Sequence, residues 1–315
     1  MKRKITIIGA GNVGSTIAYT LSVSDIATEI VLIDINDKKV KAEVMDIAQG
    51  TGLFESVSVV VGEYKDAVDS DIVIITSGIG RKPGQTRLDL TQTNVDILKI
   101  ITPEIVKYAP DALYIIVSNP VDIMTYVFTK ISGLPEKQII GSGTSLDTSR
   151  LKYKLSEHFN IVQKNIHAYV FGEHGDSSFV PWSMAKVSGA GIDEYTDMVK
   201  KLNNNISDVN KDEITEYIHT SGGEIIAGKG ATFYAVSAAV CHLCSVLFSP
   251  LDSIMTVSTM LHGEYGIDDV CLSIPNIIGP EGAKGKVEVK LTDYEVEKLK
   301  HSANVLKDII KEIKI

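Results

Sequence analysis

A glycine-rich loop near the N-terminus constrains the fold more than any other feature of the chain. An apolar run over residues 4–8 predicts a short strand, and Gly9-Ala10-Gly11-Asn12-Val13-Gly14 follows it directly. A helix is predicted from about 12 to 24 and a second strand over 29–35. A Gly-x-Gly-x-x-Gly loop between strand and helix is the signature of a dinucleotide-binding βαβ unit. Its glycines permit a tight turn, close approach of a pyrophosphate, and packing of helix on strand.

Asp34 comes twenty residues after Gly14, at the end of the second predicted strand. An acid at this offset accepts hydrogen bonds from the ribose hydroxyls of the adenosine half of a dinucleotide. A 2′-phosphate would meet like charge there, so the residue favours NAD over NADP. A turn with a chance acid would not reproduce strand, loop, helix and spacing together. The expected NAD contacts in this region are Gly9, Gly11, Asn12, Val13, Gly14 and Asp34.

Alternating strand and helix patterns continue to about residue 142. A helix is predicted over 38–49, and strands over 57–61, 72–76 and 113–117. This order predicts an α/β fold that begins with a Rossmann domain, a doubly wound parallel sheet. We therefore place an NAD-binding domain at residues 1–142 and an α+β substrate and catalytic domain at residues 143–315.

In the second half of the chain, helices and strands are no longer predicted in regular alternation. The predicted helices are 145–159, 192–209, 212–228 and 231–247, and the predicted strands are 168–171, 256–261, 270–274 and 286–289. Thr292 and Glu295 form a capping box that predicts the start of the last helix.

Composition excludes several classes of protein. The 315 residues carry a formal net charge of −9, so the chain lacks the basic excess of a nucleic-acid binder. No apolar run reaches the length needed to cross a bilayer, and the run after the basic start is too short for a signal peptide. A cytoplasmic protein is expected. Cys241-His242-Leu243-Cys244 lies in an apolar helix without a second cysteine pair, so we expect buried thiols and no metal site.

Three residues carry the expected chemistry. His174, in Gly172-Glu173-His174-Gly175-Asp176, is a base or acid near neutral pH. Asp147 would orient its ring, and Arg150, one helical turn later, offers a fork for a carboxylate. The alternatives are a loop histidine without a role and a surface ion pair on the helix. With a hydride carrier nearby, the set is that of a 2-hydroxy acid dehydrogenase.

The chain resembles the lactate/malate dehydrogenase superfamily essentially from end to end. Five segments carry the resemblance, in this order: Ile8-Gly9-Ala10-Gly11-Asn12-Val13-Gly14, Lys82-Pro83-Gly84-Gln85-Thr86-Arg87, Ser118-Asn119-Pro120-Val121-Asp122, Leu146-Asp147-Thr148-Ser149-Arg150 and Gly172-Glu173-His174-Gly175-Asp176. It implies that His174 exchanges the substrate proton while Asp147 holds its ring and stabilises the imidazolium, and that Arg87 enters from a closing loop to stabilise the C2 oxygen. By the same resemblance, Arg150 and Asn119 bind substrate.

Other contacts follow from the resemblance alone. Thr232 matches a residue between substrate and nicotinamide, and Val236, one turn later, would pack on the nicotinamide. Further cofactor contacts are implied for Thr76, Gly78, Asn94, Val117 and Asn119. The family also forms homo-oligomers, either dimers or tetramers.

Arg81 decides which substrate the sequence favours. Lactate dehydrogenases typically have glutamine two residues before the Pro-Gly of this loop, and malate dehydrogenases have arginine. Arg81 would pair with a second carboxylate, which otherwise costs several kcal/mol when water is excluded. We therefore expect reversible oxidation of L-malate to oxaloacetate. The alternative is an L-lactate dehydrogenase with Arg81 facing solvent, because Gln85–Leu90 and Lys229–Thr232 are lactate-like.

Three further expectations concern regulation and other classes of protein. Lys164 and Met184 stand where sugar-bisphosphate-activated relatives have arginine and histidine, so such activation is expected to be weak or absent. An NAD-binding sensor would have no use for the four residues Arg87, Asp147, Arg150 and His174 together. An NAD-dependent glycosidase would use a metal held partly by cysteine, for which the cysteines here are poorly placed.

Overall fold

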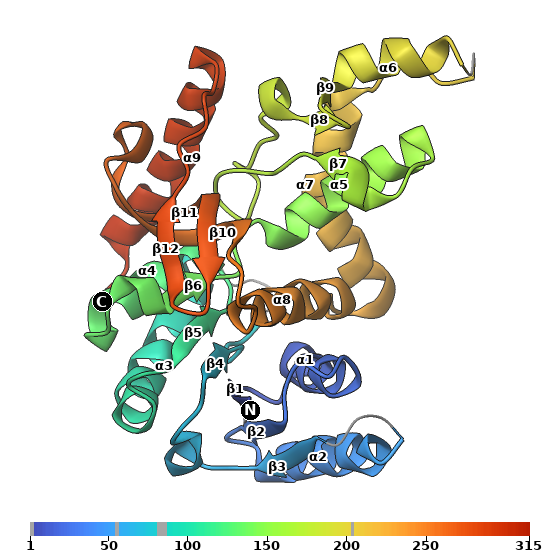
Figure 1. Cartoon of the computed structure of the whole chain (residues 1–315). Coiled ribbons are helices and arrows are strands. Elements are labelled where there is room, and N and C mark those ends of the chain that lie inside the picture. Colours follow the sequence, from blue (N-terminus) through green and yellow to red (C-terminus); the bar gives the residue numbers. More distant parts are fainter. Residues whose placement is uncertain (1–2, 54–56, 81–86, 203–204) are drawn as a thin grey trace.

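A computed structural model of the chain describes residues 3–53, 57–80, 87–202 and 205–315, without the side chain of Arg87. In these residues a sheet of nine strands runs through the molecule in the order β12-β11-β10-β6-β5-β4-β1-β2-β3. Figure 1 shows the N-terminal half, with α1, α2 and α3 around one end of this sheet, and the C-terminal half beyond the other.

The first six strands are parallel and follow the predicted doubly wound order. They are β1 (Lys4–Ile8), β2 (Glu29–Ile33), β3 (Ser58–Val61), β4 (Ile72–Ile75), β5 (Leu113–Ile116) and β6 (Ile139–Gly141). Their helices are α1 (Asn12–Val23), α2 (Asp37–Thr51), α3 (Arg87–Tyr108) and α4 (Val121–Ser132). All five residues of β1 are buried, because helices cover both faces of a parallel sheet. β1 pairs with β2 on one side and β4 on the other, so the chain reverses direction across the sheet at β1.

Three antiparallel strands extend this sheet. They are β10 (Ser253–His262), β11 (Asp268–Gly279) and β12 (Gly282–Lys286). The pair Ser258 and Gly141 joins β10 to β6. The other strands of this half, β7 (Ile166–His167), β8 (Lys186–Val187) and β9 (Ala190–Gly191), form a small separate sheet. The α/β architecture predicted from the sequence is confirmed, and the two halves share one sheet.

Five helices complete the second half: α5 (Ser145–Phe159), α6 (Ile192–Lys200), α7 (Lys211–Lys229), α8 (Tyr234–Leu247) and α9 (Asp293–Glu312). Short 3₁₀ turns occur at Tyr64–Ala67, Glu136–Gln138, Gln163–Asn165, Trp182–Met184 and Glu264–Gly266. The predicted capping box at Thr292 is present and starts α9. Among the described residues no helix has the length and apolar character to span a membrane.

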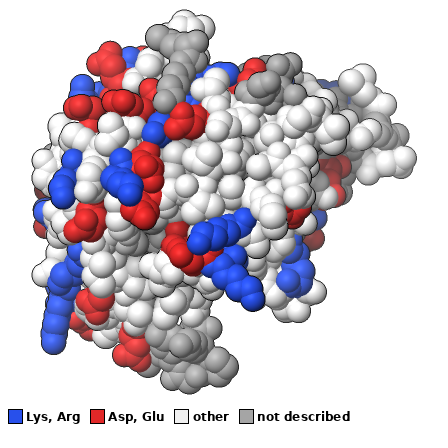
Figure 2. All heavy atoms as spheres, turned by 90° about the horizontal axis from the view of Figure 1, so that it is seen from below, with Lys and Arg blue, Asp and Glu red and all other residues white. Residues whose placement is uncertain are grey.

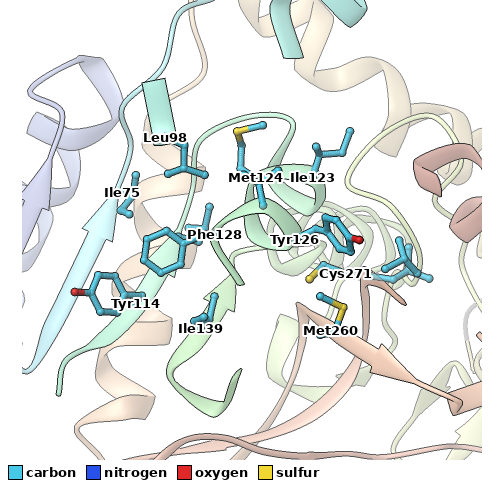
Figure 3. Close-up of a cluster of buried hydrophobic side chains, with 14 of the residues drawn as sticks. Ile75, Leu98, Tyr114, Ile123, Met124, Tyr126, Phe128, Ile139, Met260 and Cys271 are labelled. Carbon is cyan, nitrogen blue, oxygen red and sulfur yellow. The ribbon is translucent and has the colours of Figure 1, made fainter. Parts of the chain in front are cut away.

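The hydrophobic core joins elements from both halves. One cluster of buried side chains packs α3 and α4 against β5, β6, β10 and β11, and Figure 3 shows its Tyr126, Met260 and Cys271 close together. A second cluster includes Ile17 of α1 and Val240 of α8. All three cysteines of the chain are buried, and burial raises the pKa of Cys241 to about 12, so this thiol stays protonated.

Several predicted elements have different bounds in the structure, and three of them show the reasons. The strand expected over 168–171 is β7, which ends at His167, and Phe171 makes only an isolated bridge with Phe179. The helix expected over 192–209 ends at Lys200, shortly before an asparagine run with low helix propensity. The strand expected over 286–289 is β12, which starts at Gly282 because a tight turn pairs Gly279 with Gly282.

The surface charges are mixed in sign. On the face that Figure 2 shows, lysine and arginine side chains alternate with aspartate and glutamate, and wide uncharged areas separate them. This face therefore offers no continuous basic patch among the described residues. A nucleic-acid backbone would need such a patch for counterion release.

Candidate active site

A cavity of about 350 Å³ lies between the glycine-loop end of the parallel sheet and helices α5, α7 and α8. Its walls are Val13, Val117, Asn119, Leu146, Asp147, Arg150, His174, Gly175, Asp176, Ile218, His219, Gly222, Gly223, Ile226, Thr232 and Val236. Ligands of open α/β sheets bind beyond the carboxyl ends of the strands, and Val117 and Asn119 follow β5 at that edge. Residues predicted from distant motifs thus meet in one place.

His174 and Asp147 form the expected pair. Nδ1 of His174 lies 2.6 Å from Oδ2 of Asp147. A carboxylate accepts hydrogen bonds only, so Nδ1 donates, and Nε2 is left as the nitrogen that can exchange a proton. Asp147 is almost fully buried at the start of α5, while His174 is partly exposed at the cavity wall. The ring is therefore oriented by a carboxylate that is itself shielded from water.

The charges of this pair shift both pKa values. The negative charge of Asp147 raises the pKa of His174 above its ordinary value, although burial acts against the charged ring. Burial opposes ionisation of Asp147, but His174 and Arg150 outweigh it and lower the pKa of that carboxyl. The site therefore favours a carboxylate beside an imidazole that holds its proton more tightly than a free histidine.

Arg150 occupies the same wall. Its Nη1 donates to Oδ1 of Asp147 at 2.8 Å, so Asp147 is shared between Arg150 and His174. The ion pair that the sequence left as an alternative is present, but both partners lie at the cavity. A Cβ on Gly222 of α7 would lie 3.4 Å from Nη2 of Arg150, so a glycine there gives the guanidinium room. The remaining N–H groups can bind a substrate carboxylate.

The glycine loop has the geometry that a pyrophosphate needs. Gly9 adopts φ +110°, and a Cβ on Gly14 would lie 1.8 Å from the Gly9 carbonyl oxygen, so neither tolerates a side chain. Around Gly11 a Cβ would meet nothing within 4 Å. Gly11 caps α1 without a side-chain hydrogen bond, which leaves the first N–H groups of the helix for an anion. The loop thus fits the phosphates of a dinucleotide.

Asp34 holds this loop as well as facing the expected ribose position. Its Oδ2 accepts the Ala10 N–H at 2.6 Å, and its Oδ1 accepts the Asn36 N–H at 2.8 Å. Each carboxylate oxygen keeps a further lone pair for a ribose hydroxyl. Asp34 therefore fixes the loop from the neighbouring strand, a role that the spacing rule did not include.

Two predicted cofactor contacts brace the site in this structure. The hydroxyl of Thr76 donates to the carbonyl oxygens of Ile8 and Gly9, both at 3.1 Å. The buried Asn94 accepts the Ile79 N–H at 2.9 Å and donates to the Asn119 carbonyl oxygen at 2.8 Å. Gly78 packs against the Asn94 amide. These contacts hold the ends of β1, β4 and β5 in one arrangement, and direct contact with cofactor stays a prediction.

Other predicted residues divide into two groups. Thr232, Val117, Asn119, Val13 and Val236 line the cavity with His174, whereas Asn12 opens α1 and does not line it. Arg81 and the side chain of Arg87 lie outside the described residues.

Several cavity residues escaped the sequence reasoning. Gly222 and Gly223 lie within α7, and two adjacent glycines inside a helix are a signal that could have marked them. His219 and Ile218, which face the cavity from the same helix, had no such signal. Asp122 was quoted as part of a motif without a role, yet it accepts the backbone N–H of His174.

The described part of the chain contains no group of three or more His, Cys, Asp or Glu side chains arranged to hold a metal ion. The site as described offers a base, a cation for carboxylate, a hydrogen-bond donor and a dinucleotide loop.

Two family descriptions match the chain in succession. Residues 3–141 match the NAD binding domain of lactate/malate dehydrogenase. Residues 144–315 match the alpha/beta C-terminal domain of lactate/malate dehydrogenase. Together the matched segments cover nearly the whole chain.

Curated relatives and solved structures agree with these matches. The chain is 48% identical over 304 residues to an L-lactate dehydrogenase of Clostridium perfringens, covering 96% of this chain and 95% of the relative. It is 47% identical over 313 residues to an L-lactate dehydrogenase of Acetivibrio thermocellus, covering 99% of this chain and 98% of the relative. The crystal structure of the minor L-lactate dehydrogenase from Enterococcus mundtii, in the ligands-bound form, superposes with a TM-score of 0.93 at 33% identity, covering 100% and 99% of the two chains. A lactate dehydrogenase from a Medee basin deep-sea metagenome library superposes with a TM-score of 0.92 at 33% identity, covering 98% of each chain.

Proposed function

The chain belongs to the lactate/malate dehydrogenase family, with NAD as its cofactor, and we propose that within this family it is an L-lactate dehydrogenase. The substrate pair would be L-lactate and pyruvate, small 2-hydroxy and 2-oxo acids. The single observation that carries the proposal is the cavity in which His174, Asp147 and Arg150 meet beside the glycine-loop end of the sheet. The activity of the relatives described above supports the choice of substrate.

The described cavity wall supports a substrate with one carboxylate. Arg150 is the one permanently charged cation among its described residues, and its charge is already shared with Asp147. Thr232 and Ile226, which line the same cavity, carry no charge that could pair with a second carboxylate. A carboxylate buried without a partner costs several kcal/mol, so this wall favours the methyl group of lactate.

The expectation of malate rested on Arg81. That residue lies outside the described residues, and the relatives named above are L-lactate dehydrogenases. These names support the lactate alternative better than the malate expectation. The lactate alternative requires no carboxylate partner for Arg81.

The residues of the cavity divide the reaction between them. NAD, when bound, supplies the hydride acceptor for lactate oxidation. Arg150 binds the C1 carboxylate, and Asn119 donates a hydrogen bond to the C2 oxygen. His174 Nε2 takes the hydroxyl proton during oxidation and returns it during reduction. Asp147 holds Nδ1 and stabilises the protonated ring, as the carboxylate of a hydrolase triad does.

Side-by-side steady-state kinetics test the choice of substrate. We expect kcat/KM with NADH to be at least about tenfold higher for pyruvate than for oxaloacetate, a difference of about 1.4 kcal/mol. Arg81→Gln is the matched variant, and it should leave the ratio of the two constants within about threefold of the unchanged protein. An oxaloacetate preference that Arg81→Gln abolishes would overturn the proposal and restore malate as the substrate.

A further inference from the structure

Asp122 is a buried carboxylate in contact with the catalytic loop. It lies in the first turn of α4, and only 2% of its surface is exposed. Its Oδ2 accepts the backbone N–H of His174 at 2.7 Å, and its Oδ1 accepts the Ser258 hydroxyl of β10 at 2.6 Å. One carboxylate therefore ties α4, β10 and the His174 loop together.

The helix that carries Asp122 is fixed by its packing. Figure 3 shows Ile123, Met124 and Phe128 of α4 buried among core side chains, with Leu98 and Ile139 in the same cluster. Such packing leaves the helix little freedom to shift. A contact made by Asp122 therefore holds the His174 loop against a rigid part of the molecule.

The same short segment also places Asn119. Asn119 lines the cavity three residues before Asp122, and its carbonyl oxygen accepts a hydrogen bond from Asn94. The substrate oxygen must lie between the Asn119 amide and the His174 ring in the proposed reaction. Residues 119–122 thus place the groups on both sides of the substrate oxygen. Asn119 belongs to the segment, and Asp122 holds His174 through its backbone N–H.

A neutral amide could hold the same two groups at a lower cost of burial, with its oxygen accepting the His174 N–H and its NH₂ group donating to the Ser258 hydroxyl oxygen. Burial raises the pKa of Asp122 to about 6, while Ser258 and the His174 N–H act in the opposite direction. Asp122 is therefore ionised at neutral pH despite its burial, and its charge adds to that of Asp147 in raising the pKa of His174. A side chain that served only to hold α4, β10 and the His174 loop together would not need this charge.

We propose that Asp122 is a positioning residue that fixes the His174 backbone and places a second negative charge near its imidazole. The inference rests on the proposed proton transfer by His174. The other charged or titratable groups around this ring are Asp147, Arg150, Glu173, Asp176 and His219; those that face Asp122 are His174, Glu173 and Cys271.

The test is the pH dependence of pyruvate reduction by Asp122→Asn. Reduction needs protonated His174, so kcat/KM falls on the alkaline side as His174 loses its proton. Asparagine keeps the shape and can accept the His174 N–H, but it removes the charge. We expect the alkaline limb to move to lower pH by about half a unit or more. The Kd for NADH should stay within about twofold, because Asp122 does not line the cavity.

Ser302→Ala is the matched control. The Ser302 hydroxyl accepts the backbone N–H of Glu173 at 2.8 Å, so it anchors the neighbouring residue of the same loop without a charge. We expect this variant to lose some turnover and leave the alkaline limb in place. A limb that Asp122→Asn leaves unmoved, or that Ser302→Ala moves equally far, would overturn the proposal.

Ser258→Ala provides a second variant if Asp122→Asn fails to fold. Loss of the Ser258 donor removes one of the interactions that hold down the pKa of Asp122. The pKa of Asp122 then rises, so its carboxyl group stays protonated up to a higher pH than in the unchanged protein. The alkaline limb should therefore also move to lower pH, by a smaller amount than in Asp122→Asn. An unmoved limb in Ser258→Ala would also count against the proposal.

Failure of the function and failure of the inference give different results. If the unchanged protein reduces neither pyruvate nor oxaloacetate with NADH, the proposed function is wrong. If it reduces pyruvate in preference to oxaloacetate and the limb does not respond to the variants, the function stands and the role of Asp122 is refuted.

Discussion

Two buried carboxylates, Asp147 and Asp122, contact the residue expected to carry the proton, yet their pKa values move in opposite directions. Asp147 has two cationic partners, His174 and Arg150, which outweigh the effect of its burial. Asp122 has neutral donors from Ser258 and a backbone N–H, so burial dominates and raises its pKa. The difference follows from the partners of each group, since the two are similarly buried.

The raised pKa of Asp122 predicts how stability depends on pH. Its folded value of about 6 lies above the ordinary 3.8, so the folded state binds this proton more tightly than the unfolded state. The resulting stabilisation is complete below the ordinary value and is lost as pH rises through 6. Relative to Asp122→Asn, the unchanged protein should lose about 2 kcal/mol in free energy of unfolding between pH 4 and pH 7. Urea unfolding at a series of pH values measures this difference, and a flat difference would show that Asp122 is not desolvated.

Asp147→Asn tests the other carboxylate. The amide keeps the volume but removes the charge that raises the pKa of His174, and it can hold the wrong ring tautomer. We expect kcat for pyruvate reduction to fall by about 10² to 10⁴ and the alkaline limb to move to lower pH. Unchanged turnover would mean that another group orients His174.

At the scale of elements, the loop between β1 and α1 contains glycines with two different roles. One is required by the packing of the loop, and another leaves room for the cofactor. A Cβ on Gly14 would overlap the Gly9 carbonyl, whereas a Cβ on Gly11 would point into open space. Thr76 and Asp34 hold the same loop through backbone contacts. The loop is therefore rigid before any ligand binds, and its open side is the side expected to face the pyrophosphate.

The pair Gly14→Ala and Gly11→Ala tests this difference in role. Gly14→Ala should lower the free energy of unfolding by several kcal/mol, because helix and loop must move apart. Gly11→Ala should fold with nearly unchanged stability and bind NADH at least about tenfold more weakly, since its methyl group would fill the phosphate position. Thermal unfolding and fluorescence titration with NADH measure the two effects. Equal NADH affinity in Gly11→Ala and the unchanged protein would place the phosphates elsewhere.

Sequence patterns predicted elements with a local cause and missed contacts made across the chain. The glycine loop, α5 and the Thr292 capping box depend on nearby residues, and all were predicted. The junction of β10 with β6 depends on the pair Ser258 and Gly141, which no local pattern reveals. In the site, motifs identified His174 and Asp147, but the contact of Asp122 with the His174 backbone spans 52 positions and involves no side chain of His174.

At the scale of the whole molecule, the two halves share a core as well as a sheet. Helix α8 of the second half packs on α1 of the first, where the Cys241 thiol lies 3.8 Å from the Ile17 carbonyl oxygen. Val236 and Thr232, at the start of α8 and just before it, line the cavity that Val13 of α1 also lines. The site is thus assembled across the junction, so loss of this packing would separate the cofactor loop from the substrate residues.

This junction predicts that the chain unfolds in one step. Trp182, the one tryptophan in the sequence, lies in the second half, whereas the glycine loop lies in the first. If the halves are coupled, NAD⁺ bound to the first half also stabilises the surroundings of Trp182, by about 2.7 kcal/mol at a ligand concentration of 100 times Kd. Urea unfolding followed by Trp182 emission and by far-ultraviolet circular dichroism should then give one midpoint, and NAD⁺ should raise it equally for both signals at fixed protein concentration. A Trp182 midpoint that NAD⁺ leaves unmoved, while the dichroism midpoint rises, would show instead that the halves unfold separately and that the α1–α8 contact contributes little to stability.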